Sequence, residues 1–219
     1  MKGRFLKGRF MQIAAQDVLL IVDIQNDFCP GGALGVPEGD AVIPVIHRIA
    51  PFFQHVILTQ DWHPANHMSF AASHQGKQPY EMIDVAYGTQ TLWPLHCVQG
   101  TTGAEFHSAL HLPQAELIQR KGSDPEIDSY SAFFENDRKT PTGLAGYLIE
   151  RNLNRVFLAG LAYDYCVGYS ALDAHWLGLS AFVVRDACRA IDLNGSKTKI
   201  ETEFLKAGVA VIDSSEIGT

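Results

Sequence analysis

Short apolar runs and longer amphipathic stretches alternate along most of this chain. The runs carry aliphatic or aromatic residues at nearly every position, which is typical of strands buried on both faces of a parallel sheet. Six strands are predicted, over residues 18–22, 56–60, 116–120, 155–160, 181–185 and 209–213. Helices are predicted over residues 42–50, 142–152, 166–177 and 195–207. This alternation predicts an α/β fold: a doubly wound, mainly parallel six-stranded sheet with helices on both faces, in three Rossmann-like layers.

Residues 61–114 do not follow this alternation. The segment is rich in His, Pro, Gly, Gln and aromatic residues, and no regular element is predicted in it. An irregular segment of this length inside a compact domain is usually functional rather than a linker. We therefore expect part of a functional site in this segment.

Several apolar runs end in, or lead within a few residues to, a reactive side chain. The side chains that share this placement are Asp23, Asp61, His63, Lys121 and Cys166. Parallel strands place their carboxyl ends at one edge of the sheet, and open α/β sheets bind ligands outside that edge. The sequence therefore predicts that these side chains converge, and that the protein is an enzyme.

Cys166 is the candidate nucleophile. It follows a strand and a tight turn, at the predicted start of a helix, where unpaired backbone N–H groups and the helix dipole favour a thiolate and can hold an oxyanion. Asp23 could take the thiol proton and later return it to a leaving amine. Lys121 would keep that carboxylate ionised and stabilise the thiolate.

A metal site is predicted from the Asp61-x-His63 pair. On an extended segment the two side chains point the same way, because strands alternate with period 2. A third histidine would complete a site with open coordination positions. From the spacing alone the candidates are His67, His74 and His96, all in the long irregular segment.

The bulk properties limit the classes of partner. Residues 1–10 carry four cations and no acid, without the apolar core of a signal peptide, and we expect them to be a disordered extension of a single domain over residues 11–219. The rest of the chain holds 13 cations against 24 acidic residues, which argues against nucleic acid or an anionic membrane as partner. The four scattered cysteines include no C-x-x-C pair and suggest reduced thiols in the cytoplasm. The oligomeric state stays open, a homo-oligomer included.

The sequence also resembles a known family, the bacterial nicotinamidases of the isochorismatase-like cysteine hydrolase superfamily. The resemblance extends from about residue 17 to residue 213. It is carried by residues 23–29 (DIQNDFC) with 31–32 (GG), 60–67 (QDWHPANH), 93–98 (WPLHCV), 121–122 (KG), 128–134 (DSYSAFF) and 160–167 (GLAYDYCV). It implies an amidohydrolase that converts nicotinamide to nicotinate and ammonia through a cysteine thioester in NAD salvage, and that also acts on pyrazinamide.

The resemblance implies a role for each matching residue. The catalytic triad would be Asp23, Lys121 and Cys166. A divalent metal ion, zinc first and iron or manganese as alternatives, would be held by Asp61, His63 and His96, with His67 as a fourth ligand in some members only. The oxyanion would be held by the N–H groups of Ala162 and Cys166, after a cis peptide bond between Leu161 and Ala162. The ring pocket would be lined by Phe28, Leu34, Trp93 and Tyr130. Tyr163 departs from the family pattern, which usually has Thr at this position.

Three alternatives remain at this stage. Another cysteine amidohydrolase of the superfamily, acting on an N-carbamoyl or ureido substrate, would generally lack the metal ligands. A non-haem iron oxygenase uses two histidines and one carboxylate, but the ligand order here is Asp-x-His and the parallel sheet is the wrong scaffold. A metal-binding module without catalysis would leave Cys166 and Lys121 without a role.

Overall fold

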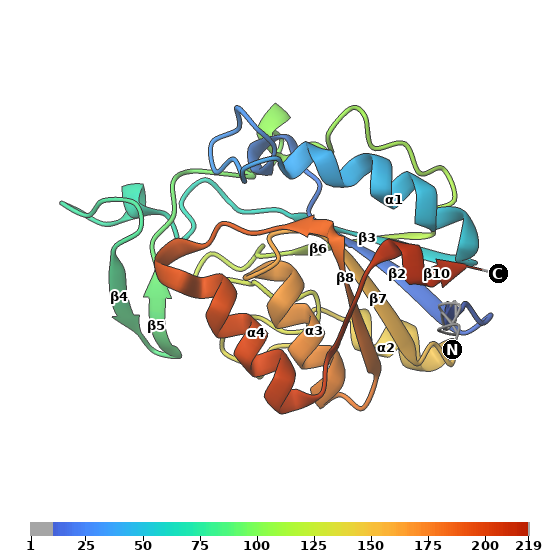
Figure 1. Ribbon diagram of the computed structural model, residues 1–219. Helices are drawn as coiled ribbons and strands as arrows, with labels where there is room; N and C mark the ends of the chain where they lie inside the picture. The colour runs from blue at the N-terminus through green and yellow to red at the C-terminus, as the bar shows by residue number, and fades with distance from the viewer. Residues whose placement is uncertain (1–10, 219) are drawn as a thin grey trace, which may run out of the picture.

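The computed structural model describes residues 11–218, and its centre is a six-stranded, wholly parallel β-sheet (Figure 1). Its spatial order is β6 (Leu117–Lys121), β3 (His55–Asp61), β2 (Asp17–Val22), β7 (Arg155–Leu161), β8 (Ser180–Arg189) and β9 (Ala210–Ile212). Every neighbouring pair in this order is parallel. The predicted fold class is confirmed. Residues 1–10, expected to be an extension, lie outside the described residues.

Helices cover both faces of the sheet. Helix α1 (Ile43–Ile49) lies over one face, and α2 (Leu144–Glu150), α3 (Cys166–Trp176) and α4 (Ser196–Ala207) lie over the other (Figure 1). The side chains of strand β2 explain why both faces of the sheet are covered. Its alternate residues Leu19 and Ile21 pack with α1, whereas Val18 and Leu20 pack with α2, α3 and α4. Because strand side chains alternate between faces, the apolar residues 18–22 of this one strand supply both cores.

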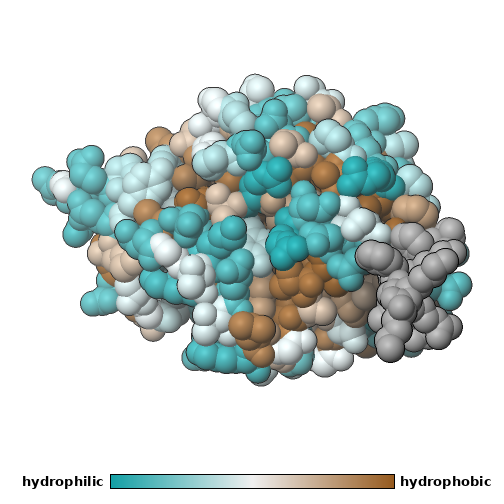
Figure 2. All heavy atoms as spheres, in the orientation of Figure 1, coloured by the Kyte–Doolittle hydropathy of each residue, from teal (hydrophilic) through white to brown (hydrophobic). Residues whose placement is uncertain are grey.

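The edge strands are less buried than the apolar runs predict. Strand β2 is buried at every position, but Ile118 on β6 is 52% exposed and Val211 on β9 is 39% exposed. An outermost strand has a neighbour on one side only, and the prediction of burial on both faces is wrong for the apolar run at β6. In Figure 2 apolar residues gather in the lower part of the visible face, beside α4, with hydrophilic residues around them.

The segment 61–114 contains one hairpin that the sequence does not predict. Strands β4 (Met82–Val85) and β5 (Gly88–Thr91) pair antiparallel and stand apart from the main sheet (Figure 1). Strand β4 has three apolar residues but is only four residues long, and β5 is polar, so neither gives the long apolar run that marks the main strands. A two-residue pair, β1 (Met11–Gln12) and β10 (Ile217–Gly218), joins the two ends of the described chain. Among the described helices, none has the length and apolar character needed to cross a bilayer.

Candidate active site

The carboxyl ends of four neighbouring strands bring the predicted side chains together. The Lys121 Nζ atom lies 2.9 Å from Asp23 Oδ2, 2.7 Å from Asp61 Oδ1 and 3.4 Å from Cys166 Sγ. Lys121 and Asp61 face each other in the β6–β3 register, and Asp23 directly follows β2. All four side chains are buried. The shared edge of the parallel sheet therefore produces the convergence that the sequence predicts.

The charges at this centre depend on burial and on one another. Burial alone would lower the pKa of Lys121, but the negative charges of Asp23 and Asp61 raise it well above its usual value, so the ammonium form persists. Burial raises the pKa of Asp23, and the charge of Lys121 partly opposes this. Burial also raises the pKa of the Cys166 thiol well above its usual value. The resting sulfur is therefore a thiol, and a base must remove its proton.

Asp23 is placed to be that base. One of its oxygens, Oδ1, accepts a hydrogen bond of 2.5 Å from the Thr59 hydroxyl, which in turn accepts one of 3.2 Å from the Asp23 N–H. The other oxygen, Oδ2, is buried and accepts no hydrogen bond of good geometry within the described part of the chain, although Lys121 lies beside it. Sequence reasoning missed Thr59. Its position could have indicated it: Thr59 lies two residues before Asp61 on β3, so the two side chains point to the same face of the strand.

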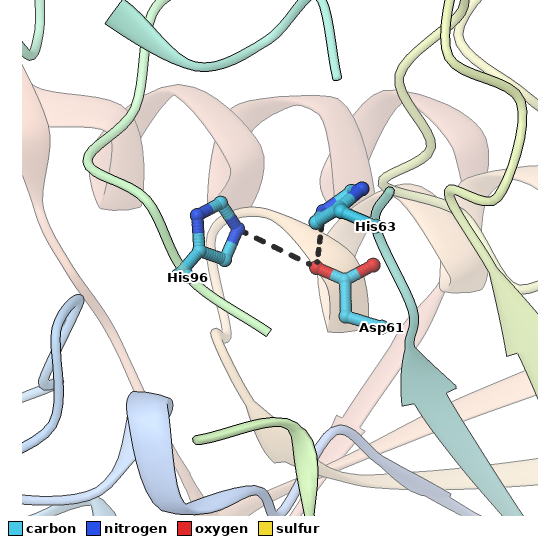
Figure 3. A group of neighbouring side chains, drawn as sticks. All are labelled: Asp61, His63 and His96. Carbon is cyan, nitrogen blue, oxygen red and sulfur yellow. Dashed lines mark hydrogen bonds and ion pairs between the residues drawn. The ribbon is translucent and has the colours of Figure 1, made fainter. Parts of the chain in front are cut away.

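Asp61, His63 and His96 form a compact group that suits a divalent metal ion (Figure 3). Their ligand atoms all lie within 4.8 Å of one another, and Asp61 Oδ2 is 3.1 Å from His63 Nε2 and 3.6 Å from His96 Nε2. On the other side of each ring, His63 Nδ1 lies 2.8 Å from the Gly122 carbonyl oxygen, and His96 Nδ1 lies 2.8 Å from the Pro94 carbonyl oxygen. Each Nδ1 is thereby assigned as the donor. Burial alone would lower the pKa of His63, but the charge of Asp61 raises it, so Nε2 of that ring loses its proton when a metal binds there.

Asp61 joins the metal group to the lysine. Its Oδ1 accepts from Lys121 and its Oδ2 faces the two histidines. Burial alone would raise the pKa of Asp61, but the charges of His63 and Lys121 together lower it well below its usual value. The carboxylate is therefore ionised, as a metal ligand must be.

The structure distinguishes among the three candidate histidines. His67 is buried, with Nδ1 2.7 Å from Ser69 Oγ and Nε2 3.3 Å from the Ile127 carbonyl oxygen. It groups with His63 and Asp128 but is absent from the Asp61 group. Burial and the charge of His63 lower its pKa to about 4, so it is neutral. His74 belongs to neither group, which leaves His96 as the third ligand that the geometry favours.

An aromatic cleft opens beside the cysteine. It is narrow and partly open to solvent. Its walls include the four side chains that the resemblance implies, together with Cys166 and two metal-group residues: Phe28, Leu34, Trp93, Tyr130, Asp61 and His96. Sequence reasoning missed Asp128, Tyr165 and Ile191 as further walls, and Tyr165 packs edge-on against Trp93 at 5.0 Å.

The turn between β7 and α3 carries the remaining predicted groups. The Leu161–Ala162 peptide bond is cis. The amide N–H groups of Ala162 and Cys166 have no protein acceptor within residues 11–218. Tyr163 is buried beneath α4, edge-on to Phe204 at 5.8 Å, and is not a wall of the cleft. Its departure from the family pattern therefore changes the core behind the turn and not the cleft.

Replacing Gly122 by alanine is expected to weaken metal binding by about 10- to 100-fold, because outer contacts of a ligating histidine have effects of this size. A Cβ at Gly122 would lie 2.4 Å from His63 Cε1 and 2.7 Å from Nδ1, so the ring must move. Competition with a chromophoric chelator measures the affinity. The matched control is Gly178→Ala, which has the same kind of positive φ (82° against 65°) but no heavy atom within 4 Å. Equal affinities of the two variants would contradict the prediction.

Comparison with known proteins agrees with this geometry. The isochorismatase domain model matches residues 17–216. The nicotinamidase of Acinetobacter baylyi is 52% identical over 94% of this chain and 97% of its own length. The solved nicotinamidase/pyrazinamidase of Acinetobacter baumannii is 51% identical, with a TM-score of 0.92 over 93% of this chain and 98% of that one. A pyrazinamidase of Pyrococcus horikoshii, solved in complex with zinc, is 35% identical, with a TM-score of 0.73 over 90% and 99% of the two chains. The chain therefore belongs to the isochorismatase family and, within it, to the nicotinamidases.

Proposed function

We propose that the protein hydrolyses nicotinamide to nicotinate and ammonia through a thioester on Cys166, in NAD salvage. The observation that carries the proposal is the contact of Lys121 Nζ with Cys166 Sγ, Asp23 and Asp61 beside an aromatic cleft. The cleft walls are largely aromatic and apolar, as suits a planar ring, and the nucleophile lies among them. Pyrazinamide presents a similar ring and carboxamide, so it is expected to be a second substrate.

Acylation begins with the Cys166 proton. Asp23 accepts it on the free Oδ2 oxygen, and the Lys121 ammonium group stabilises the resulting thiolate from 3.4 Å. The sulfur attacks the carboxamide carbon, a C–S bond forms, and the carbonyl oxygen becomes an oxyanion. When the C–N bond breaks, Asp23 returns its proton to the leaving nitrogen, which departs as ammonia.

The oxyanion needs hydrogen-bond donors that are fixed before the reaction. The N–H groups of Ala162 and Cys166 fill this role, since neither is used by an acceptor within the described protein. Such donors contribute roughly 3–4 kcal/mol each to transition-state stabilisation in comparable enzymes. Because the donors belong to the backbone of one turn, the role does not depend on the side chain at position 163.

Deacylation uses the same carboxylate. Asp23 takes a proton from a water molecule, which attacks the thioester carbon and forms a new C–O bond. The C–S bond then breaks, nicotinate is released, and the thiolate recovers its proton from Asp23. Throughout both halves Lys121 acts by its charge and not as a nucleophile.

Asp61, His63 and His96 would hold a divalent metal ion, and zinc is the first candidate because a 35% identical relative was solved with it. When bound, such an ion supplies a Lewis acid in the cleft wall that can anchor the pyridine nitrogen. Asp61 and His96 belong both to this group and to the cleft, so a bound ring would be oriented with its carboxamide toward Cys166. Four buried free thiols are in keeping with a cytoplasmic location.

The test is the formation of nicotinate and ammonia from nicotinamide by the purified, metal-replete protein. Equal amounts of both products are expected, and their formation should stop when the metal is chelated and resume when it is restored. N-carbamoyl amino acids serve as competing substrates, because cysteine amidohydrolases of the wider family act on such groups. Turnover of these but not of nicotinamide, by folded and metal-loaded protein, would refute the proposal.

A further inference from the structure

Gln90 is the one buried residue of the hairpin strands β4 and β5. These strands stand apart from the main sheet (Figure 1), and their other residues are exposed or half-buried. Gln90 is only 1% exposed, yet it is not a wall of the substrate cleft. A buried polar side chain is costly unless its hydrogen bonds are made, so the partners of this amide indicate what it does.

The neighbours of the Gln90 amide fix its orientation. Its Oε1 atom accepts from the Tyr87 hydroxyl at 3.1 Å and from Asn136 Nδ2 at 3.4 Å. Its Nε2 atom faces three oxygen atoms: Asp128 Oδ2 at 2.7 Å, the Thr91 carbonyl oxygen at 2.8 Å and the Tyr130 hydroxyl at 3.2 Å. The opposite orientation would place the amide oxygen against the Asp128 carboxylate, so Nε2 is assigned as the donor on that side.

Two of these partners, Asp128 and Tyr130, are walls of the cleft. Asp128 Oδ1 accepts from the Ser129 N–H at 2.8 Å, and within residues 11–218 the donor to Oδ2 is Gln90. The Tyr130 hydroxyl also accepts from Trp93 Nε1 at 3.2 Å, and Trp93 is a third wall. Gln90 therefore holds two walls of the cleft from outside it.

The donor to Asp128 matters because a carboxylate in a largely apolar wall is costly unless both oxygens are satisfied. With Gln90 in place, the protein supplies a donor to each oxygen. Without it, one oxygen has to be hydrated, either by water that enters the wall or by rotation of the carboxylate towards the open cleft. Both changes oppose the binding of a planar ring. The contacts among Asp23, Lys121 and Cys166 do not include Gln90 and would persist.

We propose that Gln90 is a positioning residue for substrate binding, which fixes the Asp128 carboxylate and the Tyr130 hydroxyl in the cleft wall. The hairpin β4–β5 is thereby part of the substrate site, although it contributes no wall of its own strands. The inference rests on the proposed function, because the ring that binds is taken to be that of nicotinamide. Gln90 then sets the affinity for the ring and not the rate of the chemical step.

The experiment replaces Gln90 by leucine, which has a similar volume but no donor. The KM for nicotinamide is expected to rise about 10-fold, the lower end of the effect of losing a hydrogen bond to a charged group. The kcat should stay within about two-fold of the wild type, since the lost interaction is the same in the ground state and the transition state. A purely structural defect would instead lower kcat, through loss of folded enzyme, and leave KM unchanged.

The matched control is Gln119→Leu. The Gln119 amide also donates to two carbonyl oxygens, those of Arg120 and Thr142, but it lies on β6 and does not contact the cleft walls Asp128 and Tyr130. This variant should keep the wild-type KM. If KM is unchanged in Gln90→Leu, or rises equally in both variants, the proposal is overturned.

A double-mutant cycle tests whether Gln90 acts through Asp128. Adding Gln90→Leu to Asp128→Ala should raise KM by no more than about three-fold, because the closer of its two wall contacts is already gone. The same 10-fold rise in both backgrounds would overturn the proposal. Metal content is measured on the same samples, because a ligand atom of Asp128 lies within 4.8 Å of those of His63 and His67. Loss of metal in Gln90→Leu would place its action at the metal group and also overturn the proposal.

Calorimetry with nicotinate separates this proposal from the proposed function. The affinity of metal-replete Gln90→Leu for nicotinate is expected to be about 10-fold weaker than that of the wild type, and that of Gln119→Leu should be unchanged. If the wild type does not hydrolyse nicotinamide, the proposed function fails, and a weaker affinity in Gln90→Leu alone still supports the positioning role. Equal affinities in all three proteins, or no binding to any of them, would overturn it.

Discussion

Replacing Cys166 by alanine is expected to lower nicotinamide turnover by about 10⁴-fold or more, the scale of loss when a covalent nucleophile is removed. The thioester cannot form without the sulfur, and neither Asp23 nor Lys121 can replace it. Within residues 11–218 the hydrogen bond to the thiol comes from Lys121 and not from Asp61, His63 or His96, so the metal content should stay at the wild-type value. Single-turnover assays and metal analysis of the same sample measure both quantities.

The matched control is Cys188→Ala. Cys188 is also a buried, free thiol, and burial raises its pKa to about 12, but the charges that act on it come from Asp186 and Arg189. Its replacement should leave turnover close to wild type. Substantial activity in Cys166→Ala, or an equal loss in Cys188→Ala, would remove Cys166 from the mechanism.

Replacing Lys121 by methionine is expected to reduce the free energy of unfolding of the metal-free protein by about 3–5 kcal/mol, the usual cost of removing one partner from a buried ion pair. The lysine is wholly buried, and it is the cation that Asp23 and Asp61 both contact. Methionine keeps most of the shape but leaves two buried carboxylates in mutual repulsion. Urea unfolding in the presence of a chelator measures the change, since a bound metal would offset the charge of Asp61.

Two further variants make this expectation specific. Lys206→Met removes an exposed lysine paired with Glu203 and should change the stability by no more than about 0.5 kcal/mol. Adding Asp23→Asn to Lys121→Met should restore part of the loss, because one uncompensated charge disappears. If Lys121→Met lowers the free energy of unfolding no more than Lys206→Met does, the buried charges are not coupled.

Much of the fold can be predicted from the sequence because its main signals are local. Each long apolar run became a strand, and the helix at residues 166–177 was predicted to within one residue. The hairpin β4–β5 was not predicted, since its strands are only four residues long and β5 is polar. The exposure of Ile118 was not predicted either, because a strand's place at the edge of the sheet depends on pairing between distant segments.

The site, like the fold, is predicted in part by local sequence signals and depends in part on tertiary contacts. The sequence alone places four reactive residues at or just after strand ends: Asp23, Asp61, Lys121 and Cys166. Parallel pairing of the strands is then enough to bring them to one edge of the sheet. Residue spacing does not decide among His67, His74 and His96, because all three lie in one irregular segment whose path is set by tertiary hydrogen bonds; the family resemblance implied His96, and the geometry favours it.

By itself, then, the sequence determined the alternation of elements, the sheet edge and the reactive groups on it. The spacing left the third histidine open, although the family resemblance implied His96. Only the tertiary structure decided the support of Asp23 by Thr59, the walls at Tyr165 and Ile191, and the buried, unpartnered Glu135 oxygen. The physical reason is that residue type and period are local properties, whereas burial, electrostatic coupling and cavity shape arise from segments far apart in the chain.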